Sequence, residues 1–301
     1  MQTLTLGPIT IDRIVELERW PFAPAEMFPD ITDEQVTAAL RSLGEEHVDP
    51  RGRRIVLGIQ TYLVRAPGLT VLLDTGNGND KHRPALRAHH MFHTAYLDRL
   101  RARGVRPDDI DVVVSTHLHP DHCGWNTRLS GDTWVPTFPN ARYLFARDEF
   151  APLEASFESR PEDPLAADLA RTFEDSVLPV VKAGQAAVVD TPHTILSAGD
   201  VRITMRSAPG HTRGHVVVEI EAGGRYAVAA GDVIHHPLQF ADLDLAQGGD
   251  HDRARAAATR RELCEWCVDH DAVVLTAHFA GPGVGRIVRA GDGYRFAWPE
   301  S

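Results

Sequence analysis

The sequence has little cysteine and no long hydrophobic run. Its 301 residues include only three cysteines, and this low, odd count argues against a fold held together by disulfides. No stretch approaches the ~20 apolar residues that a membrane-spanning helix needs. The first residues carry neither the basic segment nor the apolar run of a signal peptide. We therefore expect a cytoplasmic protein that has no membrane partner.

The chain also lacks a positive net charge. It has 42 acidic residues against 31 lysines and arginines, which gives a formal charge of −11. Because a polyphosphate would be repelled overall, a nucleic-acid partner and a nuclease activity are disfavoured. A content of 43% hydrophobic residues is ordinary for a globular protein, and this length suits two domains or one large α/β domain.

The most informative stretch is a cluster of polar side chains behind a hydrophobic strand. Residues 112–114 are three valines, predicted as a strand buried on both faces, and His117, His119, Asp121 and His122 follow. Alternation places His117 and His119 on one side of the extended chain, with Asp121 and His122 on the turn beyond. Imidazoles and a carboxylate suit Zn²⁺, and also Fe, Co or Mn. We predict a metal site here; a polar loop with incidental histidines is the weaker interpretation.

A similar pattern recurs later in the chain. One predicted strand ends in Asp74, and the strand before His117 follows it after a helix; another ends at Asp232, and a later buried strand leads to His278. Because strand, helix and strand recur, we expect two sheets packed face to face with helices outside. The site would lie where the strand ends of both halves meet. Asp74 would support a metal ligand through a hydrogen bond.

The other histidines are assigned from their surroundings. His211 lies in a glycine-flanked turn, where the backbone can approach a ligand closely. His215 begins the next strand and is expected to make a supporting hydrogen bond, with metal binding as the alternative. Segment 81–93 is expected to be a loop beside the pocket, because its histidines match no compact metal site. These four are His82, His89, His90 and His93.

The cysteines are expected to be inert. Cys264 and Cys267 form a C-x-x-C inside a helical pattern, away from a helix start that would stabilise a thiolate. We expect both to be small buried residues on one helix face. Cys123 adjoins the histidine cluster, where it is either a spectator or a labile thiol; we favour the spectator.

The remaining segments outline the domain organisation. Residues 1–54 are expected to form a strand and an arm packed on a single domain, residues 55–301. Within the arm, prolines should keep residues 20–29 out of helix and sheet. That segment would line a substrate entrance, form a homodimer contact or pack on its own domain. An acidic, alanine-rich helical insertion is expected at about residues 150–185.

Together the motifs resemble those of the metallo-β-lactamase superfamily. His-x-His-x-Asp-His at residues 117–122 is followed, in the superfamily's order, by residues 210–212, 231–232 and His278. The resemblance spans about residue 55 to the C-terminus. It implies an α/β fold, an αββα sandwich of two mixed β-sheets with helices on the outer faces. It also implies two divalent ions, with Zn²⁺ favoured. The implied ligands are His117, His119 and His211 for one ion, Asp121, His122 and His278 for the other, and Asp232 as a bridge.

Within the superfamily, the chain looks more similar to quorum-quenching lactonases and methyl parathion hydrolase-like enzymes than to antibiotic-degrading β-lactamases. The complete ligand set, residues 231–240 and residues 293–296 carry this similarity. Some of those lactonases have a tyrosine three residues after the bridging aspartate, where this chain has His235. The difference keeps lactones, aryl esters and phosphotriesters open as substrates.

The expected reaction is hydrolysis of a small-molecule ester or lactone. Two cations sharing a water lower its pKa toward ~7, and the resulting hydroxide attacks the carbonyl. Asp121 would either pass a proton to the leaving oxygen or act only as a ligand. His235, His236, Gln239 and Phe279 follow ligand positions and would shape the pocket. The alternatives are a thioesterase similar to glyoxalase II, a β-lactamase and, from another class, an iron-dependent oxidoreductase.

Overall fold

The computed structural model describes residues 3–299 and groups them into two compact units. Unit 1 comprises residues 17–59 and 192–299, and unit 2 comprises residues 3–16 and 60–191. The expected arm at residues 1–54 and single domain at residues 55–301 stay predictions. Within residues 3–299, no helix combines the length and apolar character needed to cross a membrane.

Unit 2 carries most of an eight-stranded mixed sheet. The strands β5, β6, β9 and β10 run parallel to one another, whereas β1, β2, β3 and β4 pair antiparallel to their partners where a register is given. The strands in spatial order are β1 (Leu4–Leu6), β2 (Ile9–Phe22), β4 (Arg54–Ala66), β5 (Leu69–Leu73), β6 (Val112–Val114), β9 (Arg142–Ala146) and β10 (Ala186–Val189), with β3 (Val48–Asp49) beside β4.

Helices of unit 2 pack on this sheet through one hydrophobic cluster. Tyr96 and Leu100 of α3 and Phe150 of α5 join Val113 of β6 and Tyr143 of β9 in that cluster. The helices are α3 (Tyr96–Arg101), α4 (Pro120–Cys123), α5 (Arg147–Ser159), α6 (Pro164–Thr172) and α7 (Leu178–Lys182), with a π-helical turn at Phe173–Val177 and a separate hairpin, β7 (Thr127–Ser130) and β8 (Thr133–Pro136). The segment at about residues 150–185 is helical as expected, with its first helix beginning at Arg147, and its being an insertion stays a prediction.

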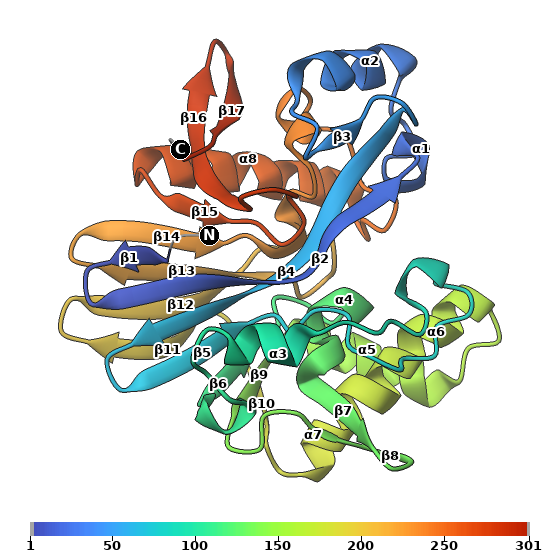
Figure 1. Ribbon diagram of the computed structural model, residues 1–301, viewed down its shortest axis with the longest axis vertical. Helices are drawn as coiled ribbons and strands as arrows, with labels where there is room; N and C mark the ends of the chain where they lie inside the picture. The colour runs from blue at the N-terminus through green and yellow to red at the C-terminus, as the bar shows by residue number, and fades with distance from the viewer. Residues whose placement is uncertain (1–2, 300–301) are drawn as a thin grey trace. The chain divides into compact units, whose positions relative to one another are not determined.

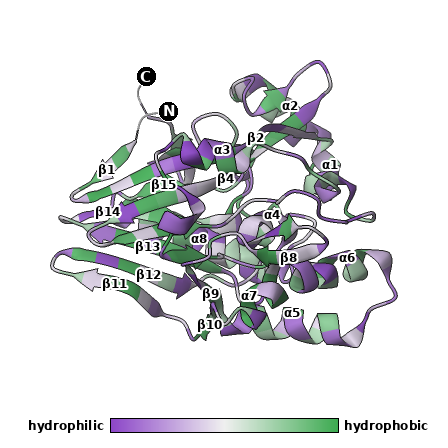
Figure 2. Ribbon diagram, turned by 60° about the horizontal axis from the view of Figure 1, so that its bottom comes forward, coloured by the Kyte–Doolittle hydropathy of each residue, from purple (hydrophilic) through white to green (hydrophobic). Residues whose placement is uncertain are grey.

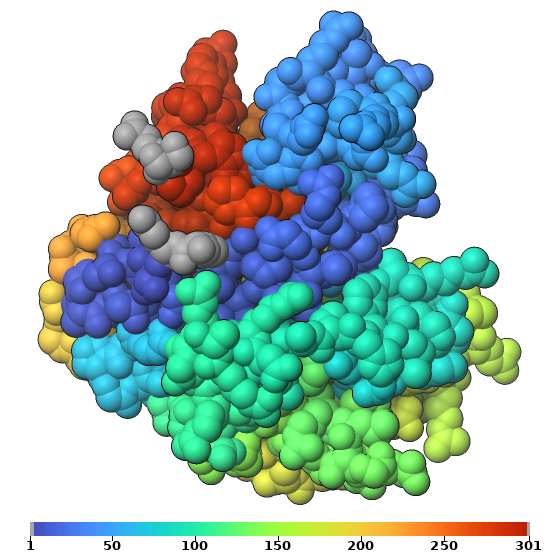
Figure 3. All heavy atoms as spheres, in the orientation of Figure 1, coloured from blue at the N-terminus to red at the C-terminus, as the bar shows by residue number. Residues whose placement is uncertain are grey.

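A long loop of unit 2, residues 77–94, lies against these helices. Arg83 donates two parallel hydrogen bonds to the Asp175 carboxylate, at 2.7 and 2.8 Å. The backbone N–H groups of Ala85 and Leu86 donate to Asp168 of α6. In Figure 3 the teal atoms of this loop lie beside the yellow-green atoms of the helical segment. The prediction of a loop at residues 81–93 is confirmed, apart from a short 3₁₀ turn at Arg87–His89.

Unit 1 contains a seven-stranded sheet, in which β14 and β15 are parallel and the other pairs are antiparallel. Helix α8 (Arg253–Asp269) packs on it through Leu263, Cys264 and Cys267, which lie in one cluster with Val228 and Val274 (Figure 1). Green, hydrophobic residues dominate β13 to β15 in Figure 2, as expected of strands covered by a helix. The strands are β11 (His193–Ala198), β12 (Val201–Ser207), β13 (Val216–Ala222), β14 (Arg225–Ala229), β15 (Val273–Leu275), β16 (Val284–Ala290) and β17 (Gly293–Ala297).

The predicted recurrence of strand, helix and strand is confirmed in each unit. In unit 2, β5 leads through α3 to β6, and Leu73 pairs with Val114 at their carboxyl ends. In unit 1, β14 leads through α8 to β15, and Ala229 pairs with Leu275. When parallel strands end in register, the residues that follow them lie at the same edge of the sheet. In each unit, polar residues lie at this edge.

The proline-rich segment at residues 20–29 corrects one expectation. Strand β2 continues through Pro21 to Phe22, and residues Pro24–Met27 form α1, so the prolines do not exclude regular structure. Pro24 stands at the first helical position, where the missing N–H costs nothing. Phe28 is fully buried among Leu57, Leu238 and their neighbours, which favours an arm packed on its own unit. Helix α2 (Asp33–Ser42) follows, capped by Thr32.

Candidate metal centre

The first group of candidate ligands lies in unit 2, just beyond β6. His119 is the N-cap residue of α4 and Pro120 its first residue, so the turn expected for Asp121 and His122 is the single turn of this helix. The helix forms because proline at the first position has the required φ and no N–H to satisfy. His117, Asp121 and His122 are buried and His119 is partly buried.

These four side chains gather in a small space. The ring centroid of His117 lies 4.6 Å from that of His119 and 4.0 Å from that of His122. His122 Nε2 is 3.9 Å from Asp121 Oδ2. The structure therefore brings together all four residues that the sequence placed behind the valine strand. We refer to His117, His119, Asp121 and His122 as the unit 2 half-site.

Asp74 orients this half-site, as predicted. Its Oδ2 lies 2.9 Å from His122 Nδ1 and also accepts the Thr116 hydroxyl at 2.9 Å, while Oδ1 accepts the Thr116 N–H at 2.7 Å. Asp74 adopts φ +56°, a left-handed conformation that aspartate tolerates better than most residues. Because a carboxylate can only accept, Nδ1 of His122 carries the proton and Nε2 keeps a lone pair for a cation.

Two further contacts fix the backbone around the unit 2 half-site. Glu149 of α5 accepts the Leu118 N–H at 2.9 Å, a contact with no local sequence signal. On the far side, Gly124 packs against the loop that follows Asp74, where an added Cβ would overlap the Asn77 carbonyl group. The loop after β5 is thus a packing partner of the histidine motif.

The second group lies in unit 1 and comes from three loops. Asp232 follows β14, His278 follows β15, and His211 lies in the turn between β12 and β13. Asp232 Oδ2 is 3.4 Å from His211 Nε2, and its Oδ1 is 3.1 Å from His278 Nε2. His211, Asp232 and His278 are all buried. We refer to these three residues as the unit 1 half-site.

The Nδ1 atoms of His211 and His278, which point away from Asp232, also have hydrogen-bond partners. His211 Nδ1 lies 3.0 Å from Asp250 Oδ1, and His278 Nδ1 lies 2.9 Å from the Gly58 carbonyl oxygen. Since both partners accept only, each neutral ring presents the lone pair of Nε2 toward the Asp232 carboxylate. A nitrogen lone pair that faces a carboxylate is unfavourable unless a proton or a cation lies between them. The donor set therefore fits divalent metal ions.

Asp250 was not found from the sequence. It lies in the loop before α8, and its Oδ2 accepts the Gln247 N–H at 2.9 Å and lies 3.5 Å from Arg260 Nη1. Burial opposes ionisation of Asp250, but the hydrogen bond with His211 and the nearby positive charges outweigh it, so the pKa of Asp250 lies below its usual range. Only its place before a helix, at no fixed distance from His211, marks it in the sequence.

Two more histidines surround Asp232. The Asp232 N–H donates to His215 Nε2 at 3.0 Å, which confirms the supporting hydrogen bond predicted for His215. His235 Nε2 lies 3.0 Å from Asp232 Oδ2, and its ring stacks on that of His278 at a centroid distance of 5.8 Å. Burial lowers the pKa of His235, and the charge of Asp232 opposes this shift.

The other residues expected to shape the pocket have structural contacts. Gln239 Oε1 accepts the His235 N–H at 2.8 Å, and Phe279 is buried in the cluster under α8. His236 Nε2 bonds the His47 carbonyl oxygen at 2.9 Å. The cysteines behave as expected: all three are buried, and burial raises the pKa of the Cys123 thiol and that of Cys264, the latter to about 12.

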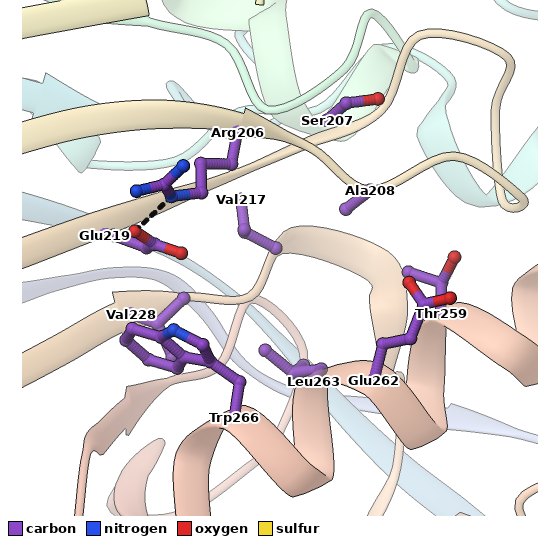
Figure 4. Close-up of a pocket in the computed structure, with 10 residues that line it drawn as sticks. All are labelled: Arg206, Ser207, Ala208, Val217, Glu219, Val228, Thr259, Glu262, Leu263 and Trp266. Carbon is purple, nitrogen blue, oxygen red and sulfur yellow. Dashed lines mark hydrogen bonds and ion pairs between the residues drawn. The ribbon is translucent and has the colours of Figure 1, made fainter. Parts of the chain in front are cut away.

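A separate groove in unit 1 contains none of these residues. It has a volume of about 150 Å³ and lies between strands β12 to β14 and helix α8 (Figure 4). The Arg206–Glu219 ion pair borders one side, and Leu263 and Trp266 form its apolar floor. Its lining includes none of the candidate metal ligands.

A family comparison agrees with this geometry. The family model described as the metallo-beta-lactamase superfamily matches residues 54–264. The chain belongs to the metallo-β-lactamase superfamily. This confirms the resemblance to the superfamily found from the motifs. It also confirms the expected fold class, a mixed α/β fold with two sheets.

Curated relatives in this superfamily act on acyl compounds. The N-acyl homoserine lactonase AiiB of Agrobacterium fabrum is 34% identical over 109 residues, which are 33% of this chain and 36% of that protein. The chain thus matches only about a third of the length of this lactonase. The acyl-coenzyme A thioesterase MBLAC2 of Bos taurus is 26% identical over 77% of both chains. These relatives agree with the expectation of a metal-dependent hydrolase.

Solved structures show the same fold. The hydrolase AbOPH of the β-lactamase superfamily superposes with a TM-score of 0.82, at 23% identity, over 99% of this chain and 97% of that one. AidC, described as a dizinc quorum-quenching lactonase, gives a TM-score of 0.77 at 21% identity, over 100% and 97% of the two chains. At these identities the likeness establishes the metallo-β-lactamase fold alone.

Proposed function

We propose that this protein is a metal-dependent hydrolase that cleaves a carboxylic ester or lactone at a binuclear centre. The two half-sites together supply the seven ligands. His117, His119 and His211 would hold one ion, and Asp121, His122 and His278 the other, with Asp232 shared between them. Zn²⁺ is the ion that this set of nitrogen and oxygen donors favours, and Fe, Co and Mn are alternatives.

The observation that carries the proposal is the orientation of the ligand histidines. His122, His211 and His278 each have Nδ1 bonded to an oxygen that only accepts, so Nε2 is the atom offered to a ligand. In unit 1, two of these nitrogens face one carboxylate, that of Asp232. A lone pair in this orientation is stabilised when a cation lies between Nε2 and the carboxylate, which supports a bound metal ion.

When bound, two divalent ions would lower the pKa of a water and polarise the substrate carbonyl. The chain's own groups have distinct tasks. The carboxylates of Asp232 and Asp121, which are both buried, would balance the positive charge. Asp121 would also carry a proton to the leaving oxygen. His235 lies beside Asp232, with its Nε2 3.0 Å from Asp232 Oδ2, and would help to position that carboxylate.

The substrate class follows from the relatives. Similarity to the Agrobacterium fabrum lactonase supports a lactone or ester, although it covers only 36% of that protein. Similarity to the thioesterase spans 77% of both chains and favours an acyl thioester as the second candidate. Both substrates present an acyl carbon to the same nucleophile, and they differ only in the leaving atom. The cytoplasmic location, a homodimer and the absence of a nucleic-acid partner stay predictions.

The test is a substrate panel assayed with and without bound metal. The purified protein is offered an N-acyl homoserine lactone, a p-nitrophenyl ester, an aryl phosphotriester and an acyl-coenzyme A thioester. We expect hydrolysis of the lactone or ester to disappear after chelation and to return when Zn²⁺, Co²⁺ or Mn²⁺ is restored. Faster cleavage of the thioester would select the second candidate.

Two outcomes would reject the proposal. Undiminished hydrolysis by fully metal-free protein would exclude a metal-dependent reaction. Oxygen consumption by the iron-loaded protein, without hydrolysis of any substrate in the panel, would favour an oxidoreductase. The variant His93→Gln is a suitable control, since His93 is exposed and belongs to neither half-site.

A further inference from the structure

A buried ion pair stands behind one ligand of the unit 1 half-site. Asp250 holds His211 through Oδ1, and its other carboxylate oxygen faces Arg260 of α8 at 3.5 Å. The side chains of Asp250 and Arg260 are both fully buried, so solvent does not screen the charge between them. Arg260 Nε donates to the Leu243 carbonyl at 2.8 Å, which fixes the guanidinium in place.

The corresponding carboxylate in unit 2 has a different environment. Asp74 holds His122 at 2.9 Å, but its other hydrogen-bond partners are the N–H and hydroxyl of Thr116, which are neutral. Among the described residues, no lysine or arginine pairs with Asp74. In these contacts no guanidinium or ammonium faces Asp74, whereas a guanidinium faces Asp250.

This difference bears on how strongly each histidine binds a cation. A carboxylate that accepts the Nδ1 proton makes the imidazole a stronger ligand at Nε2. A positively charged group beside that carboxylate weakens the attraction of the carboxylate for the Nδ1 proton. It also repels a nearby metal ion. His122 therefore gains more from Asp74 than His211 gains from Asp250.

We propose that Arg260 is a positioning residue that, through Asp250, weakens metal binding by His211, so that the ion held by His211 is the first to leave. The inference rests on the proposed function, because it assumes that both half-sites bind metal. It predicts one firmly held ion and one exchangeable ion in the same enzyme. The exchangeable ion would be the one coordinated by His117, His119 and His211.

The first experiment uses the unaltered protein loaded with two equivalents of Zn²⁺. A chelator is added stepwise, the retained metal is measured by atomic emission, and the histidine side chains are followed by proton–nitrogen NMR. We expect two separate release steps, with the His211 signals changing in the first and the His122 signals in the second. Earlier change of the His122 signals, or release of both ions in one step, would overturn the proposal.

Two substitutions of Arg260 separate charge from structure. Arg260→Met and Arg260→Lys both lose the fixed hydrogen bond to Leu243, but only Arg260→Lys retains a positive charge. We expect Arg260→Met to bring the two release steps closer, by a shift of about tenfold in chelator concentration, and Arg260→Lys to release its ions like the wild type. Equal behaviour of the two variants would show a purely structural role.

A matched pair of carboxylate substitutions completes the test. Asp250→Asn should weaken the ion bound through His211 by about 10–100-fold and leave the His122 step unchanged. Asp74→Asn should weaken the other ion by a similar factor. Loss of both ions together in either variant would contradict the assignment. If the unaltered protein binds no metal at all, the proposed function fails; if it binds two ions in the reverse order, only this inference fails.

Discussion

The two half-sites bring similar ligands together in different ways. In unit 2 all four candidate ligands fall at residues 117–122, and a strand end and a four-residue helix place them. In unit 1 the ligands come from three loops, and the parallel pairing of β14 with β15 brings Asp232 and His278 to one edge. The unit 2 half-site should therefore respond to local backbone changes, and the unit 1 half-site to changes in charge and in sheet packing.

The largest expected effect is loss of the charge at the centre of the unit 1 half-site. Asp232 is the only carboxylate among those three ligands, and the Nε2 atoms of His211 and His278 both face it. Asp232→Asn should reduce hydrolysis to the level of the metal-free protein and lower the bound metal per chain. Metal analysis and an esterase assay measure this. Asp292→Asn, the same change at an exposed turn, is the control and should match the wild type.

The backbone contact behind the unit 2 half-site comes next. An added Cβ at Gly124 would overlap the Asn77 carbonyl, so Gly124→Ala should lower the free energy of unfolding by about 1–3 kcal/mol or more. Urea unfolding measures the loss. Gly293→Ala is the matched control, because the nearest atom to its Cβ would lie 3.8 Å away. Equal stability of the two variants would contradict the local dependence inferred for unit 2.

These contrasts explain which parts were predictable from the sequence. Val112–Val114 and the ligands at 117–122 are contiguous, so the strand and the unit 2 half-site could be predicted from spacing. His211, Asp232 and His278 lie far apart; the strand ends and a glycine-flanked turn marked them as candidates, but their assignment to particular ions came only from the family resemblance. The contacts of Asp250 with His211 and of Glu149 with Leu118 depend on tertiary packing, which no local pattern encodes.

The expectation about prolines failed for a physical reason. Pro21 was expected to interrupt the sheet, yet β2 continues through it to Phe22. Proline has no N–H to donate. A strand tolerates this loss where no neighbouring strand would accept that hydrogen bond. Pro24 starts a helix turn instead of preventing one. Composition alone therefore predicted irregular structure where the positions of the prolines permit regular elements.

Two buried histidines give unit 1 a dependence on pH. Burial lowers the pKa of His47 to about 4 and that of His236 to about 3. Between pH 6.5 and these values the unfolded chain binds protons that the folded chain does not, so stability falls as the pH falls. His47→Phe, which can still stack on Trp298, should remove about 2 kcal/mol of the loss between pH 7 and pH 5. Urea unfolding at both pH values tests this, and an unchanged difference would refute it.

The smallest effect is expected in the histidine-rich loop of unit 2. His93 is exposed and pairs only loosely with Asp80, at 3.3 Å, so it differs from the buried ligand histidines. His93→Gln should change the free energy of unfolding by less than about 0.5 kcal/mol and leave the metal content unaltered. Loss of one ion in this variant would mean that the 81–93 loop contributes a ligand.

The most direct test of the central claim is the number of divalent ions per chain, measured together with ester or lactone hydrolysis during chelation. We predict two ions in the loaded protein and hydrolysis that falls as they are removed and recovers when they are restored. Full hydrolysis at zero bound metal would contradict the claim that these histidines and aspartates form the catalytic centre.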